Sequence, residues 1–173
     1  MILFRQTPPG YPFLWENLSQ PEGRWHGPGE GPAHYCADTP DGAWAEFLRH
    51  QDIKDSIDLP GINRDLWAIE VADKEPFHHV RLSHTVCTAK DYRPCQAEAK
   101  HLRAAGATGV KAPSAALVPD VASGFVVEGG LKPAPRRNGS VYVLFGRRTD
   151  LIGWRAAAEA HPSPDLLSKV RYL

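Results

Sequence analysis

The chain has 173 residues, 42% of them hydrophobic, which is enough for a folded domain with its own core. Lysine plus arginine and aspartate plus glutamate number 20 each, so the formal net charge is zero. This balance leaves no basic excess to hold a nucleic-acid backbone or an anionic membrane surface. We therefore expect direct binding to neither nucleic acid nor membrane.

The cysteines and the N-terminus argue against secretion. Three cysteines are an odd number, too few and too scattered for a disulfide framework, and we expect them to be reduced. The chain starts without a long apolar run behind a basic segment, unlike a signal peptide or a membrane anchor. These features predict a cytoplasmic protein. The three cysteines are Cys36, Cys87 and Cys95.

The first thirty residues are rich in proline and glycine, which interrupt helical and strand patterns, so we predict an ordered loop there. Aromatic residues such as Trp15 and Trp25 favour packing of this loop over disorder. A short strand is predicted over residues 33–37 and a helix over residues 40–50. Thr39 is the expected N-cap of that helix, with a proline at the first helical position.

The central part of the chain combines turn signals with two periodic segments. A polar connection is predicted over residues 52–63 and a strand over residues 66–71. A weaker pattern predicts a strand at residues 80–82. Residues 91–106 are predicted to be a helix with one apolar stripe, ended by Gly106.

The last part of the chain contains three short apolar runs bounded by glycine and proline. They predict strands over residues 109–112, 124–128 and 141–145. Residues 129–139 are predicted to be an exposed loop, and residues 164–170 a short helix. Strands mixed with a few short helices, without regular β-α-β alternation, predict an α+β fold in one domain over residues 1–173.

Three residues are candidates for chemistry, and each has a simpler interpretation. Arg24 lies in a glycine-rich segment and could grip phosphate, or it could be a surface arginine stacked on Trp25. Glu46 could stabilise a cationic sugar transition state, or be a solvated helix residue. Ser114 could build a site at a strand end, or simply belong to a turn. It lacks a Gly-x-Ser-x-Gly elbow, so a hydrolase triad has little support.

Metal and dinucleotide motifs are not evident. The spacing of histidines and cysteines between residues 78 and 101 fits no familiar zinc pattern, so no metal site is expected. No Gly-x-Gly-x-x-Gly follows a predicted strand, which excludes a Rossmann dinucleotide site.

The candidates nevertheless occur in an order that resembles the RES domain family, named after an arginine, a glutamate and a serine. Arg24, Glu46 and Ser114 match those three positions. The resemblance implies a fold similar to ADP-ribosyltransferases, with a mixed or antiparallel β core flanked by short helices. The matching segments are Gly23, Arg24 and Trp25; Tyr35; residues 45–50; residues 106–110; and Pro113, Ser114 and Ala115.

The resemblance also implies roles for these residues. Arg24 would bind the phosphates of NAD, with Trp25 also in the NAD-binding site, and Tyr35 would pack on the nicotinamide-ribose end. Glu46 would favour the cationic sugar in the transition state, and Ser114 would orient the substrate. NAD would be a substrate, and no prosthetic group is expected.

The family resemblance implies the toxin component of a RES-Xre type toxin-antitoxin module, an enzyme that cleaves the nicotinamide-ribose bond of NAD. The alternatives are a glycohydrolase, a phosphorylase, a protein ADP-ribosyltransferase, and a catalytically silent binding module. A helix-turn-helix antitoxin is the expected partner, in a heteromer, and a homodimer is the other assembly considered. Residues 116–138 could shape an acceptor site or an antitoxin interface. The sequence leaves open the acceptor and the choice between NAD and NADP.

Overall fold

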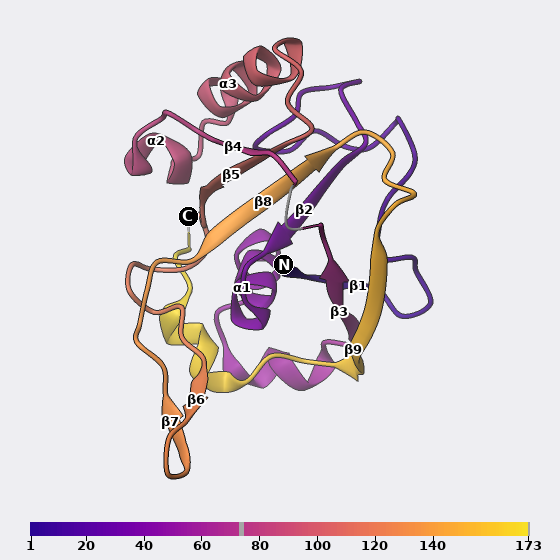
Figure 1. Ribbon diagram of the computed structural model, residues 1–173. Helices are drawn as coiled ribbons and strands as arrows, with labels where there is room; N and C mark the ends of the chain where they lie inside the picture. Colours follow the sequence, from indigo (N-terminus) through magenta and orange to yellow (C-terminus); the bar gives the residue numbers. More distant parts are fainter. Residues whose placement is uncertain (73–74, 173) are drawn as a thin grey trace.

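A computed structural model describes residues 1–72 and 75–172 of the chain. Its centre is a seven-stranded sheet in the order β4-β5-β8-β2-β1-β3-β9 (Figure 1). Among the described residues, neighbouring strands in this sheet are antiparallel, except for the parallel pair of β4 and β5. The strands are β1 (Ile2–Thr7), β2 (Ala33–Ala37), β3 (Arg64–Glu70), β4 (Phe77–His79), β5 (Gly109–Pro113), β8 (Ser140–Phe145) and β9 (Ile152–Ala160).

Short helices and one separate hairpin complete the fold. The predicted α+β class, a mixed β core flanked by short helices, is confirmed. No helix in the described part of the chain is both long and apolar enough to span a membrane. The elements are the helices α1 (Pro40–His50), α2 (His84–Thr88) and α3 (Arg93–Ala104), the 3-10 helices η1 (Ser56–Gly61) and η2 (Pro164–Lys169), and the hairpin strands β6 (Phe125–Val127) and β7 (Leu131–Pro133).

The helix α1 begins where its local signals predict. The Thr39 side chain accepts a hydrogen bond from the Gly42 amide, and Pro40 occupies the first turn. The helix predicted over residues 91–106 is confirmed as α3 but is shorter at both ends. Gly106 follows it with a φ of 91°, a left-handed conformation that glycine adopts without strain.

The helices α1, α2 and α3 pack on one face of the sheet, and a separate hydrophobic cluster packs on the other. In β8, Val143 packs with α2, α3 and Trp25 on one face, whereas the next residue, Leu144, packs in a cluster on the opposite face. Helix α1 covers the first face beside these helices, in a cluster that includes Ala37 of β2. Ser114 follows β5 on this helical face, between α1 and α2.

Two strands lie where no strand is predicted. The predicted N-terminal loop is wrong for residues 2–7, because β1 pairs with β3 from Ile2 opposite Glu70 to Thr7 opposite Asp65. The prolines after Thr7 end that strand and do not exclude it. Strand β9 is not predicted, since it is rich in alanine, which has little strand preference; its pairing with β3 determines its conformation.

Two further predictions are corrected in detail. The strand predicted at residues 80–82 lies instead at Phe77–His79, where it pairs with β5, and the following α2 is unpredicted. The loop predicted over residues 129–139 contains β7, which pairs with β6 across two glycines of positive φ. Prolines at residues 133 and 135 obscure this strand, although a hairpin with free outer edges tolerates them.

Candidate active site

Arg24 is presented by a tight turn. The backbone groups of Gly23 and His26 pair in both directions, with N–O distances of 3.0 and 3.4 Å, so Arg24 and Trp25 form the tip. A Cβ atom at Gly23 would lie 2.6 Å from the Tyr35 hydroxyl, which leaves room only for glycine. The sequence Gly-Arg-Trp is therefore a compact turn pressed against strand β2.

Hydrogen bonds of His26 and Tyr35 hold this turn in place. The Trp25 amide donates to the Tyr35 hydroxyl at 2.8 Å, and that hydroxyl lies 2.9 Å from His26 Nδ1. His26 Nε2 lies 2.9 Å from the Pro21 carbonyl, which can only accept, so Nε2 carries the proton. Burial lowers the pKa of His26 and raises the pKa of Tyr35, so burial favours the neutral form of both groups.

Glu46 and Ser114, far apart in sequence, are in direct contact. The Ser114 hydroxyl donates to Glu46 Oε1 at 3.0 Å and accepts from the Ala116 and Leu117 amides at 3.2 and 3.1 Å. A hydroxyl has one donor and two acceptor positions, so all three are used. Ala116 also donates to Glu46 Oε1, whereas no described residue hydrogen-bonds Oε2. One carboxylate oxygen is fixed and the other remains available.

Arg49 joins this pair to helix α2. It lies one turn after Glu46 in α1, so both side chains share a face of the helix. Its guanidinium donates to the carbonyls of Ala115, Arg171 and Thr88, the last two at 2.9 and 3.0 Å. Burial and the neighbouring Arg24 lower the pKa of Arg49, and Glu46 opposes this. Arg49 thus connects the Ser114 loop, the C-terminal segment and the end of α2.

Arg24 reaches the same end of α2 from the other side. Its Nη1 donates to the Ala89 carbonyl at 2.7 Å, one residue after the carbonyl bound by Arg49. Its guanidinium carbon lies 4.4 Å from the centre of the Tyr92 ring. The alternative that Arg24 stacks on Trp25 is wrong in its partner, because Trp25 points into the core and Tyr92 supplies the stacking ring.

The structure therefore gathers the three predicted residues into one continuous network. Glu46 and Ser114 touch directly, and Arg24 joins them through Arg49 and consecutive carbonyls of α2. Trp25 is only 1% exposed in the cluster beneath α3, where it supports the turn and faces no ligand space. Tyr35 is half-buried, and its hydroxyl is directed at the turn. The predicted NAD contacts of Trp25 and Tyr35 stay predictions.

The charge of this site favours an anionic ligand. Arg49 and Arg171 lie near a single carboxylate, Glu46, which raises the pKa of both against the lowering effect of burial, and Arg24 lies near Arg49. Arginines present paired donors that suit phosphate groups. Three positive charges around one carboxylate leave a net positive potential at the site.

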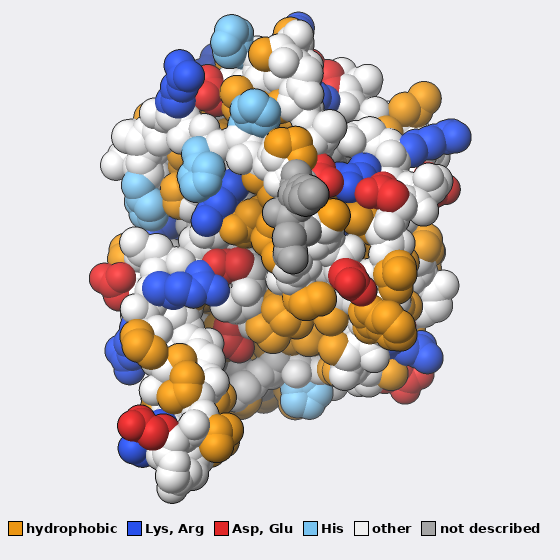
Figure 2. Space-filling model, in the orientation of Figure 1, with side chains coloured by type: hydrophobic (Ala, Val, Ile, Leu, Met, Phe, Trp, Pro, Cys, Tyr) orange, Lys and Arg blue, Asp and Glu red, His pale blue; other side chains and the backbone are white. Residues whose placement is uncertain are grey.

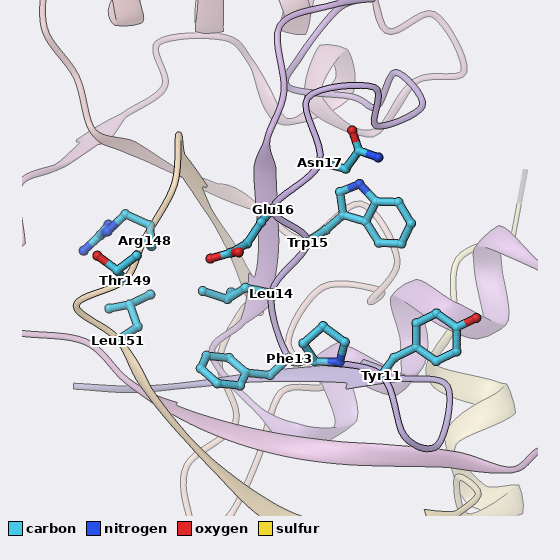
Figure 3. A pocket seen from close by; sticks show the side chains of 10 residues that line it. Tyr11, Phe13, Leu14, Trp15, Glu16, Asn17, Arg148, Thr149 and Leu151 are labelled. Carbon is cyan, nitrogen blue, oxygen red and sulfur yellow. The ribbon is translucent and has the colours of Figure 1, made fainter.

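A surface cavity lies away from this network. A cavity of about 560 Å³ is formed by residues 11–17 of the N-terminal loop and residues 148–151 after β8, which face each other in Figure 3. None of the network residues lines it. No group of three or more histidine, cysteine or acidic side chains among the described residues could hold a metal ion, and the three cysteines are buried and free.

Sequence reasoning missed three residues of the network. Arg49 could have been found from its spacing of three residues after Glu46, which places both on one helix face. His26 follows the predicted motif directly, yet its burial depends on Tyr35 of another element. Tyr92 carries no local signal, because its position over Arg24 depends on the packing of α3.

The protein is of the α+β class. On the helical face of its sheet, a carboxylate, a serine and a pair of arginines form one network. The RES domain family model matches residues 3–127, and the chain belongs to the RES domain family. The predicted family is thereby confirmed.

Solved structures agree with this assignment at the level of the fold. The chain is similar to a chain in the crystal structure of the M. tuberculosis MbcT-MbcA toxin-antitoxin complex, with 19% identity and a TM-score of 0.63. The likeness covers 96% of this chain and 86% of that chain. No curated protein matches the sequence.

Proposed function

We propose that this protein is a toxin that binds NAD and cleaves its nicotinamide-ribose bond, passing ADP-ribose to water or phosphate. A carboxylate with one fixed and one available oxygen, beside a pair of arginines, carries the proposal. Membership of the RES family and the fold shared with a chain of a toxin-antitoxin complex support it. A helix-turn-helix antitoxin would neutralise the enzyme in the cytoplasm, where NAD is abundant.

The bond cleavage requires mainly charge stabilisation. Nicotinamide leaves with the bonding electron pair and becomes neutral, so it needs no proton from the protein. Positive charge develops on the ribose carbon, and the available oxygen of Glu46 stabilises it. Water, or phosphate, then forms the new bond to that carbon, with loss of a proton when water attacks.

Ser114 acts in this scheme through Glu46. Its hydroxyl proton and both lone pairs are used within the protein, so it is not a nucleophile. It holds the carboxylate in one orientation, and Ser114 is a positioning residue. This differs from the expectation that the serine orients the substrate directly.

Arg24 and Arg49 have different roles in the proposed binding of the NAD phosphates. Arg49 donates three hydrogen bonds to carbonyls and holds the site together. Arg24 is mostly buried and donates to one carbonyl, that of Ala89, with a further side-chain hydrogen bond to Cys95. A guanidinium has five N–H donors, so Arg24 keeps more donors for the diphosphate of NAD than Arg49 does. Arg24 is therefore the substrate-binding arginine and Arg49 a positioning one.

Product analysis tests the proposal. The purified chain is incubated with NAD, with and without phosphate, and the products are resolved by chromatography and mass spectrometry. Nicotinamide with ADP-ribose, or with its phosphorylated form when phosphate is present, is the expected result. Nicotinamide release only with an added protein acceptor would indicate an ADP-ribosyltransferase. A chain that neither binds nor cleaves NAD would be a binding module, and the proposal would be wrong.

A further inference from the structure

The hairpin of β6 and β7 exposes one apolar face. Phe125 stands opposite Pro133 and Val127 opposite Leu131, so these four side chains lie on the same side of the hairpin. Phe125 is 69%, Val127 84% and Leu131 72% exposed. The hairpin projects from the rest of the molecule at the lower left of Figure 1, and Figure 2 shows apolar side chains along it. We call this hairpin the arm.

Such a face is unusual for a protein that acts alone. A two-stranded sheet is marginally stable by itself and normally buries its apolar face against other elements. In the described structure nothing covers this face, although the rest of the chain offers packed clusters. Contiguous exposed apolar side chains on an ordered element are typical of a binding surface.

The arm is connected to the site by a ladder of hydrogen bonds. The ladder continues from the paired strands through the stem of the arm to the residue that follows β5. The stem of the arm is therefore joined by hydrogen bonds to Ser114, which contacts Glu46 of α1. The rungs, by N–O distance, are Ala134 to Gly124 at 2.8 Å, Ala122 to Arg137 at 3.0 Å, Arg137 to Ala122 at 2.9 Å, and Ser114 to Gly139 at 2.9 Å.

The arm and its stem carry charges of both signs, and one basic residue, Arg136, is left unpaired among the described residues. Lys132 lies on the opposite face of the arm, 3.5 Å from Glu128. Arg136 in the stem is exposed and has neither a hydrogen bond nor an ion pair within the described residues. A complementary surface would combine apolar side chains with carboxylates.

We propose that the arm is the docking surface for the antitoxin, which covers Phe125, Val127 and Leu131 with apolar side chains and pairs a carboxylate with Arg136. This inference rests on the partner part of the proposed function. A second copy of the chain fits less well, since a stable interface buries about 1,200–2,000 Å² in total. Four side chains from each of two copies supply less than that, so the antitoxin must also cover surface next to the arm, including Arg136.

Binding measurements with matched variants test the inference. The chain is titrated with the product of the adjacent gene, and the dissociation constant is measured by calorimetry. Val127→Asp places a carboxylate on the apolar face, and Val126→Asp, on the opposite face of the same strand, is the control. We expect Val127→Asp to weaken binding about tenfold or more and Val126→Asp less than about threefold. Arg136→Glu is expected to weaken it by several-fold.

Each other outcome identifies what is wrong. Equal affinities of Val127→Asp and Val126→Asp, with the wild type bound, would overturn the docking surface and leave the partner in place. Failure of the wild type to bind the gene product would overturn both this inference and the proposed antitoxin. Self-association of the wild type that Val127→Asp abolishes would assign the face to a second copy. NAD cleavage, measured in the same samples, is expected to be unchanged in all three variants.

Discussion

The candidate site has two halves that the protein builds differently. The carboxylate half, Glu46 and Ser114, stands on helix α1 and the end of β5, next to the centre of the sheet. The arginine half, Arg24 and Tyr92, stands on a tight turn and on the residue before α3. Arg49 is the link between the halves. The carboxylate, which in the proposed function stabilises the reacting carbon, thus rests on regular elements, and the arginine proposed to bind phosphate rests on loops.

The difference follows from what each half must do. A charge that acts on a transition state is effective only when it is already oriented, so Glu46 gains from a fixed support. A charge that binds substrate must admit the substrate and release the product, which loops allow more readily. Changes in the carboxylate half should therefore alter kcat, and changes in the arginine half should alter KM.

Glu46→Gln gives the largest expected effect. The amide oxygen still accepts from Ser114, but the charge is lost, so kcat for nicotinamide release should fall about a thousandfold with little change in KM. Asp41→Asn, on the same helix, is the control and should remain within about twofold. Steady-state release of nicotinamide measures both. A rise in KM with unchanged kcat would contradict the division between the halves.

Arg49→Met should remove the hydrogen bonds that connect the two halves and so destabilise the protein. It leaves the Thr88 and Arg171 carbonyls without this donor and the Ala115 carbonyl with only the longer bond from Arg171, so the free energy of unfolding should fall by about 2–4 kcal/mol, measured by urea denaturation. Arg93→Met, which removes only an exposed ion pair with Asp91, should leave the free energy of unfolding nearly unchanged. Similar losses in both variants would mean that Arg49 does not connect the elements.

Arg24→Ala should affect binding more than chemistry. We expect KM for NAD to rise about thirtyfold and kcat to change less than about threefold, because the lost contact serves the ground state and transition state alike. Arg24→Lys should recover only part of the loss, since lysine lacks the paired donors. A large fall in kcat at constant KM would place Arg24 in the chemical step instead.

Lowering the pH should destabilise the turn that carries Arg24 before the carboxylate half. This is the smallest of the expected effects. Burial lowers the pKa of His26, so an unfolded turn, with a histidine pKa of about 6.5, binds a proton that the folded turn excludes. The stability of the turn is complete above that pH and decreases as pH falls towards the folded pKa. Between pH 7.5 and 5.5, KM for NAD should rise a few-fold.

His26→Gln is the control for this effect. Its amide nitrogen can still donate to the Pro21 carbonyl, but it does not titrate, so its KM should depend less on pH. KM is measured for both proteins across the same pH range. Identical pH profiles would show that His26 does not control the turn.

Local signals in the sequence predicted the elements that depend on local contacts. The helix α1, with its Thr39 cap, and the helix α3 are examples. Strands β1 and β9 were missed because both gain their conformation by pairing with β3, a contact that no local pattern encodes. Of the two strands of the arm, only β6 was predicted, because it is an apolar run. The prolines in and after β7 obscure its strand pattern.

The site shows the same limit. Family resemblance identified Arg24, Glu46 and Ser114 from their order, yet the Glu46 to Ser114 contact spans 68 positions in sequence. The use of every hydrogen-bonding position of Ser114 could not be read from the sequence. The burial of Trp25 was also beyond it, because a tryptophan beside a predicted binding residue could equally face the ligand or the core.

The position of β8 in the sheet has a consequence for synthesis in the cell. This strand lies between β5 and β2, the strands that carry Ser114 and precede the helix of Glu46. A ribosome makes the chain from the N-terminus, so both residues emerge before the strand that brings their elements together. Under the proposed function, the growing chain would remain inactive until residues 140–145 leave the exit tunnel. The proposed antitoxin, if already present, would then meet each new molecule at the moment it becomes active.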